Sequence, residues 1–174
     1  MKRRHFIAGS LAASGTTLLP ETLLATNNRP LPATKKMAAW HKGFAGALKP
    51  FHTNNLTIEG KWPADAYGSF YRNGPAQMER NGIRLQHWFD GDGMVHRLNI
   101  NAKGISHRSQ FVATEKYLRE ESAQAFLYNA TGTPISNARA PRNNDSVNVA
   151  NTALLPWQDE LLALWEGGSA YSLI

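Results

Sequence analysis

The 174-residue chain contains no cysteine. Disulfide bonds, thiolate metal sites and a cysteine nucleophile are therefore all excluded. The chain also lacks the run of about 20 continuous apolar residues that a membrane-spanning helix needs. Its longest weakly apolar stretch, near the amino terminus, is interrupted by glycine, serine and threonine between Gly9 and Thr17. No exact internal repeat is present, so periodicity alone predicts no repeat architecture.

The chain has no segment in which charges of one sign are concentrated. The formal net charge is +6, and beyond residue 25 there remain 16 basic and 12 acidic residues. The basic residues are scattered and form no run, which favours a solvated surface over a nucleic-acid-binding face. We therefore expect no nucleic-acid partner.

Residues 1–25 have the order of a secretion signal. Arg3 and Arg4 precede a weakly apolar region that extends through Leu19, and small residues follow up to Ala25. Paired arginines before a modest apolar region are typical of twin-arginine export in bacteria. We therefore expect a periplasmic or exported protein; a cytosolic protein with an accidental basic start is the alternative. The twin-arginine route carries folded proteins, often with a cofactor inserted.

Residues 26–55 are expected to form a linker and a short amphipathic helix. Apolar residues recur along one stripe that Pro50 ends, at Met37, Trp40, Phe44 and Leu48. One interpretation is a helix lying on the body of the protein. The other is weak contact with a membrane surface through neighbouring lysines. The first is favoured, because a narrow stripe containing Gly43 and Gly46 makes a poor interfacial anchor.

From Leu56 onward the pattern is that of an all-β chain. Turn signals separate short strands, which is typical of a sandwich, barrel or propeller. The expected strands are Leu56–Glu59, Gly68–Arg72, Arg84–Phe89, Met94–Ile100, Ile105–Thr114, Ser146–Leu155, Glu160–Glu166 and Ala170–Ile174. The expected turns are Asn73–Pro75, Asn81–Gly82, Asp90–Gly93, Asn101–Gly104 and Pro156–Asp159. Lys116–Phe126 is expected to be helical and Asn129–Asn144 to be a polar loop.

The stretch HWFDGDGMVH, from His87 to His96, predicts a β-hairpin. Asp-Gly between strand-like runs is a strong short-range hairpin signal. With a four-residue loop at Asp90–Gly93, His87 would face His96 with Cβ atoms about 5 Å apart. Such a pair could chelate a metal, but a site needs further ligands, so a structural hairpin is favoured. A calcium loop is excluded, because Val95 and Asn101 stand where glycine and a carboxylate are required.

Five motifs in fixed order carry a resemblance to a known family. They are YRNGP (Tyr71–Pro75), HWFDGDGMVH, FVAT (Phe111–Thr114), SVNVANTALL (Ser146–Leu155) and LLALWEGG (Leu161–Gly168). The series resembles the amino-terminal third of the carotenoid cleavage oxygenases, a family that includes stilbene-cleaving dioxygenases and retinoid isomerases. An ordered set is far more specific than any single motif. The resemblance runs from about Leu56 to the end of the chain.

The resemblance implies a seven-bladed β-propeller with an axial ferrous ion on four histidines. Glutamates outside the ligand shell accept the Nδ1–H of ligand histidines, which orients Nε2 toward the metal. In this sequence Glu166 of LLALWEGG matches one such glutamate; its alternative role is to cap a turn before Gly167. The ligand histidines are expected beyond Ile174, so no catalytic residue and no metal ligand is assigned here. We expect the chain alone to hold no Fe²⁺.

Length supports the same interpretation. Seven four-stranded blades need roughly 220–340 residues, at about 8–12 residues per strand and turn. Residues 56–174 are therefore expected to form an incomplete β-propeller, inactive by itself. The implied parent enzyme cleaves a conjugated double bond of a carotenoid, apocarotenoid or stilbene-like polyene with dioxygen. A non-catalytic, exported β-rich binding or structural module is the alternative.

The export signal generates a direct prediction. Changing both Arg3 and Arg4 to Lys should retain the precursor in the cytoplasm, because the twin-arginine route selects for the arginine pair. Fractionation of cells expressing the two forms, followed by immunoblotting, checks this outcome. An unchanged periplasmic yield of the double variant would remove the export interpretation.

Overall fold

The computed structural model describes residues 45–47 and 49–173. The expected signal at 1–25 and most of the expected amphipathic helix lie outside these residues. The described part is mostly β with a single α-helix, which confirms the all-β class. Its elements in chain order are β1 (His52–Thr53), β2 (Gly68–Gln77), β3 (Glu79–Arg80), β4 (Ile83–Arg84), η3 (Trp88–Asp90), β5 (Asp92–Asn101), β6 (Gly104–Phe111), α1 (Glu115–Ala123), η4 (Asn144–Val147), β7 (Ala153–Trp157), β8 (Glu160–Leu164) and β9 (Tyr171–Ser172).

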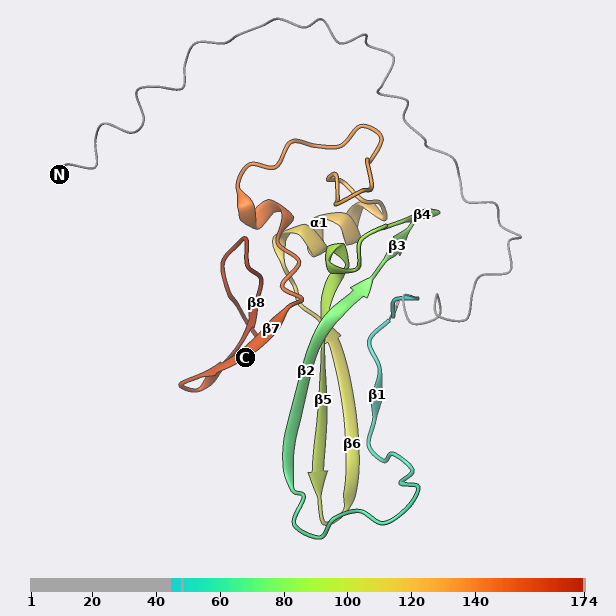
Figure 1. Ribbon diagram of the computed structural model, residues 1–174, viewed down its shortest axis with the longest axis vertical. Coiled ribbons are helices and arrows are strands. Elements are labelled where there is room, and N and C mark those ends of the chain that lie inside the picture. Colours follow the sequence, from blue (N-terminus) through green and yellow to red (C-terminus); the bar gives the residue numbers. More distant parts are fainter. Residues whose placement is uncertain (1–44, 48, 174) are drawn as a thin grey trace, which may run out of the picture.

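The largest sheet is antiparallel, with strand order β1-β6-β5-β2. Its long strands extend to one side in Figure 1, while α1 and the β3–β4 hairpin lie at the other end. The β5–β6 hairpin turns at Asn101–Gly104, where Gly104 has φ +129° and the Asn101 side chain accepts from the Lys103 amide. This turn and its two strands confirm the sequence prediction. A third sheet has the order β7-β8-β9.

The Asn73–Pro75 turn was predicted wrongly, since these residues lie inside β2. Pro75 pairs with Gly93, and the register shifts immediately after it. Because β2 is the edge strand of its sheet, a proline there breaks no ladder on a second side. The Asn73 side chain donates to the carbonyls of Ala150 and Ala153, at 2.8 and 3.2 Å. The Asn-Gly-Pro sequence thus joins β2 to β7.

The predicted His87–His96 hairpin is also wrong. Residues 88–90 form η3, and β5 pairs with β2 on one side and β6 on the other. Gly91 has φ −69°, so the glycines of this motif do not make a left-handed turn. Gly93 instead allows close packing: a Cβ there would lie 2.3 Å from the Ala150 carbonyl oxygen. The Gly93 amide donates to the Val149 carbonyl at 2.8 Å.

Other strand predictions have the wrong limits. Leu56–Glu59 is not a strand. Of the predicted strand Arg84–Phe89 only Arg84 is in a strand, as the second residue of β4. The predicted strand Ala170–Ile174 is reduced to β9, Tyr171–Ser172. The predicted strand Ser146–Leu155 begins in η4 and becomes regular only at Ala153. Polar side chains there bond the local backbone: the Ala150 amide donates to Asn148 Oδ1 at 2.9 Å. Such bonds compete with a ladder.

The helix and the polar loop are confirmed, although the helix spans Glu115–Ala123 and ends three residues before the predicted Phe126. Thr114 caps α1 by accepting from the Tyr117 amide at 3.0 Å, and Gln124 ends the helix in the left-handed conformation. Within the described residues, the segment 129–144 has no regular strand, only an isolated bridge between Ala130 and Thr133. No helix among residues 45–47 and 49–173 combines the length and apolarity needed to cross a bilayer.

Four charged side chains are buried together between β5 and α1. Lys116 donates to Asp92 and Glu120, both at 2.8 Å, and Arg80 lies 3.4 Å from the second Asp92 oxygen. Asp92 and Glu120 are fully buried, and Lys116 is only 6% exposed. Burial by itself would lower the pKa of Lys116, but the two carboxylates outweigh it and hold that pKa above its ordinary value. Lys116 therefore stays charged in the fold.

His96 has a histidine neighbour, but a different one from that predicted. On β5 it lies opposite Ser109, and its Nδ1 is 3.0 Å from Nε2 of His107 on β6. The ring planes differ by only 22°, with centroids 5.2 Å apart. One shared proton satisfies this contact. Burial, then His107 and Arg72, lower the pKa of His96.

The buried ion pairs give a stability prediction. Changing Lys116 to Met should lower the free energy of unfolding by about 3–5 kcal/mol, because two buried carboxylates lose their partner. The matched control is Arg119→Met in the same helix, which breaks a half-exposed pair with Glu115 and should cost less than about 1 kcal/mol. Thermal unfolding of the purified variants measures both. Equal losses would show that the buried pairs carry no special weight.

The histidine pair gives a pH prediction. Because the folded-state pKa of His96 is lowered, the unfolded chain binds a proton more readily as the pH falls below about 6.5. The stability contribution is therefore complete above that pH and is lost as the pH falls through the lowered pKa. Between pH 7 and pH 5, the Tm should fall less in His96→Asn than in the wild type. The control His87→Asn should keep the wild-type slope; a loss of slope in it instead would refute the assignment.

Candidate functional site

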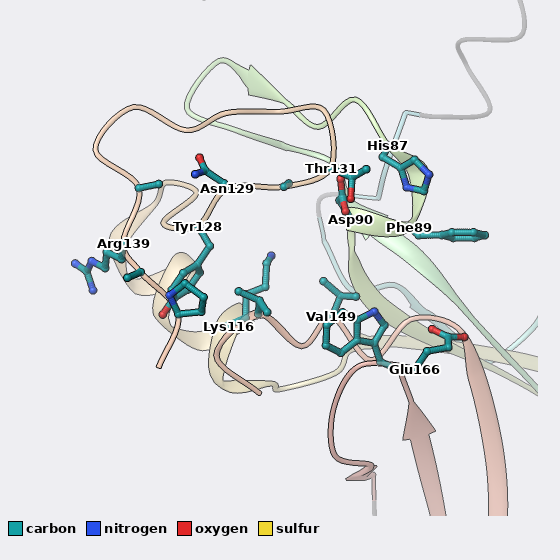
Figure 2. Close-up of a pocket in the computed structure, with 16 residues that line it drawn as sticks. His87, Phe89, Asp90, Lys116, Tyr128, Asn129, Thr131, Arg139, Val149 and Glu166 are labelled. Atoms are coloured by element: carbon teal, nitrogen blue, oxygen red, sulfur yellow. The ribbon is translucent and has the colours of Figure 1, made fainter. Parts of the chain in front are cut away.

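A cavity of about 680 Å³ lies between η3, α1, the loop after α1 and the end of β8. Figure 2 shows His87, Phe89 and Glu166 on one side, with Tyr128, Asn129 and Arg139 on the other. Much of the lining is apolar, from Phe89, Tyr128, Ala130, Ala138, Ala140, Pro141, Val147, Val149 and Trp165. A mostly apolar cavity of this size with few polar groups is typical of a small-molecule site.

The η3 side of the cavity is positioned by Asn151. Its Nδ2 donates to the carbonyl oxygens of Phe89 and Gly91, both at 2.7 Å. Asn151 is 2% exposed and lies in the SVNVANTALL motif, about 60 residues from the backbone it holds. Two of the motifs are therefore joined directly, and Phe89 and Asp90 are fixed at the cavity wall.

The charged groups that line the cavity differ in whether they already have hydrogen-bond partners. Lys116 lines the wall, but its ammonium is already bonded to Asp92 and Glu120. Asp90 Oδ2 is buried with no hydrogen-bond partner among the described residues. Asp90 is thus the lining residue with a buried acceptor still available.

Glu166 lies directly after β8 and Trp165, at the rim of the cavity. Its side chain is exposed, and among residues 45–47 and 49–173 it takes part in no hydrogen bond or ion pair. A capping role would require such a contact to a backbone amide. The carboxylate is instead free to accept an N–H from a group that approaches the cavity.

The described residues do not supply a set of iron ligands. Their histidines are His52, His87, His96 and His107, and no three His, Asp or Glu side chains of the described part converge on one point. His87 lines the cavity, whereas His96 and His107 lie on the long sheet. The described residues therefore do not by themselves provide the ligand set of a metal ion.

The structure places Glu166, the residue singled out by the sequence, at the cavity, but sequence reasoning did not anticipate the rest of the wall. Tyr128 and Arg139 belong to an irregular loop with no periodicity, and buried Lys116 resembles an ordinary solvent-facing helix residue. Asp90 and Phe89 were noticed for a turn that does not form. The motifs were the available signal: HWFDGDGMVH, SVNVANTALL and LLALWEGG each contribute residues to the cavity wall.

The model of the family described as retinal pigment epithelial membrane protein, RPE65, matches residues 47–174. The apocarotenoid-15,15'-oxygenase of Synechocystis sp. is 36% identical over 138 residues, which cover 77% of this chain and 28% of that protein. Resveratrol cleavage oxygenase 1 of Aspergillus fumigatus is 31% identical, covering 75% of this chain and 26% of that protein.

Solved structures agree with the sequence relatives. Cobalt-substituted Synechocystis apocarotenoid oxygenase superimposes with a TM-score of 0.65 and 34% identity, over 78% of this chain and 29% of that one. The chain thus spans less than a third of the proteins it matches. The motif order, the family model, the sequence relatives and the solved structures agree. The chain belongs to the RPE65 family of carotenoid cleavage oxygenases and corresponds to its amino-terminal part.

Proposed function

We propose that this chain is the amino-terminal part of a non-haem iron(II) dioxygenase that cleaves a conjugated carbon–carbon double bond. The observation that carries the proposal is the free carboxylate of Glu166, at the rim of a largely apolar cavity, in a member of this family. Iron(II) on neutral imidazoles with open positions activates dioxygen in non-haem oxygenases. The ligand histidines would come from chain beyond these residues.

The role proposed for Glu166 is to orient a ligand histidine. Its carboxylate would accept the Nδ1–H of that imidazole, which fixes the tautomer and directs Nε2 at the metal. The anionic carboxylate also supplies negative charge to a site whose ligands are neutral. No partner within the described residues competes for it.

The proposed substrate is an apolar molecule with a conjugated double bond. Relatives are named for apocarotenoid, carotenoid, resveratrol and isoeugenol. These compounds share a double bond conjugated to a polyene or an aromatic ring. Phe89, Tyr128 and Trp165 contribute aromatic surface to the lining, and the few polar groups of such a substrate could meet His87, Asp90 or Arg139.

We also propose that the enzyme is exported through the twin-arginine route to the periplasm. The support is the Arg3-Arg4 pair ahead of a modest apolar region. Export in a folded state suits an enzyme that acquires iron before leaving the cytoplasm.

The proposal is tested by Glu166→Gln in the complete oxygenase. Glutamine keeps the size but removes the charge, so iron affinity or turnover should fall about 10–100-fold with little change in Tm. The matched control is Glu160→Gln, an exposed glutamate at the start of β8, the strand that precedes Glu166. Iron content, turnover of an apocarotenoid and thermal unfolding are measured together. Wild-type iron occupancy and turnover in Glu166→Gln would overturn the role.

A further inference from the structure

We propose that Asp145 is a positioning residue for Glu166, acting through the backbone of Gly168 and Ser169. The inference rests on the proposed function of Glu166. Asp145 belongs to η4, in the polar segment before the third sheet, about 20 residues from the loop that it contacts. The loop Glu166–Ser169 and residues Asn143–Asp145 line a shared surface hollow.

Asp145 holds Ser169 by two hydrogen bonds. Its Oδ1 accepts from the Ser169 amide at 2.7 Å, and its Oδ2 accepts from the Ser169 hydroxyl at 2.8 Å. Asn148 completes the contact by donating its Nδ2 to the Ser169 carbonyl at 2.9 Å and to Asp145 Oδ1 at 3.1 Å. Every polar group of Ser169 is thus engaged by η4 and its C-cap residue.

The contact demands the glycines of the motif. A Cβ at Gly168 would lie 2.5 Å from Asn148 Nδ2 and 2.7 Å from Asp145 Oδ1. A Cβ at Gly167 would lie 2.7 Å from the Trp165 ring. The Gly-Gly pair therefore lets the chain approach η4 on one side and Trp165 on the other.

The loop is anchored at both ends. Before Glu166, the carbonyl of Leu164 accepts from the Thr152 amide at 3.2 Å and from its hydroxyl at 2.9 Å. After Glu166, the anchor is the Asp145–Ser169 contact. Glu166 has no partner of its own among the described residues, so the direction of its carboxylate depends on these two backbone anchors.

The base of the contact is itself fixed. Asn143 caps η4 by accepting from the amide and the hydroxyl of Ser146, both at 3.0 Å. Ser146 and Asn148 are fully buried. The hydrogen bonds from the Ser169 amide, from Asn148 and from the Ser169 hydroxyl lower the pKa of Asp145, so it accepts as a carboxylate at neutral pH.

The test uses Asp145→Ala and Asp145→Asn in the complete oxygenase. Alanine removes both acceptors. Asparagine retains one oxygen for the Ser169 amide, and its NH₂ can donate to the Ser169 hydroxyl. Asp145→Asn should therefore keep most of the wild-type iron affinity. The control is Asp159→Ala in the exposed β7–β8 turn, which should match the wild type.

Three readouts separate positioning from simple folding. Hydrogen exchange of the peptide that contains Trp165–Ser169 should speed up in Asp145→Ala. Iron affinity, from competition with a chelator, should fall about 10-fold, near the lower limit for residues that orient metal ligands. The ligand-field absorption of the cobalt(II)-loaded variant should shift from that of the wild type.

The outcomes are distinct. Faster exchange with wild-type iron affinity and an unchanged cobalt spectrum would overturn the proposal, leaving Asp145 as a structural residue only. Wild-type iron affinity in Glu166→Gln would overturn the proposed function, and the positioning role with it. If Asp145→Ala does not fold, Ser169→Ala removes the hydroxyl bond alone and should lower iron affinity about 2–3-fold; no loss in that variant counts against the proposal.

Discussion

The buried carboxylate of Asp92 is the contact on which the described fold depends. It begins β5, and through Lys116 and Arg80 it connects the long sheet to α1 and to the β3–β4 hairpin. The neighbouring residues of the same motif contact other parts of the fold. Gly91 gives its carbonyl to Asn151, and Gly93 packs against Ala150. Three consecutive residues thus connect the long sheet to the helix, to the segment before the third sheet and to the cavity wall.

A buried carboxylate at Asp92 requires charged side chains around it. An uncompensated buried charge is strongly unfavourable, so Asp92 requires a cation, and Lys116 in turn requires Glu120. The second carboxylate oxygen of Glu120 accepts a hydrogen bond from the Leu127 amide at 2.9 Å, which fixes the start of the loop around the cavity. The inward face of α1 is consequently ionic. For this reason the helix lacks a clear apolar stripe, although it packs against the core.

The turns that could be predicted from the sequence are those in which the glycine itself adopts the turn conformation. Asn81–Gly82 and Asn101–Gly104 turn as expected because glycine there adopts positive φ, +75° at Gly82 and +129° at Gly104. Asn73-Gly74-Pro75 and Asp90–Gly93 have similar composition but do not turn. Gly91 and Gly93 instead permit close approach of Met78 and Ala150, and the Asn73 side chain bonds the distant backbone of Ala150 and Ala153. Sequence alone does not distinguish the two uses of glycine, because only the tertiary neighbours differ.

The same argument explains which part of the site was visible beforehand. Glu166 was assigned through its motif, whereas its surroundings come from residues far away in the chain. Asn151 holds η3 across 60 residues and Asp145 holds Ser169 across 24. Such side-chain-to-backbone bonds leave no periodic trace, and they lie in segments with no regular structure. A free carboxylate on a loop can orient a ligand only if that loop is immobile. In the role proposed for Glu166, the polar, irregular segments that hold its loop would determine how well the carboxylate orients a histidine.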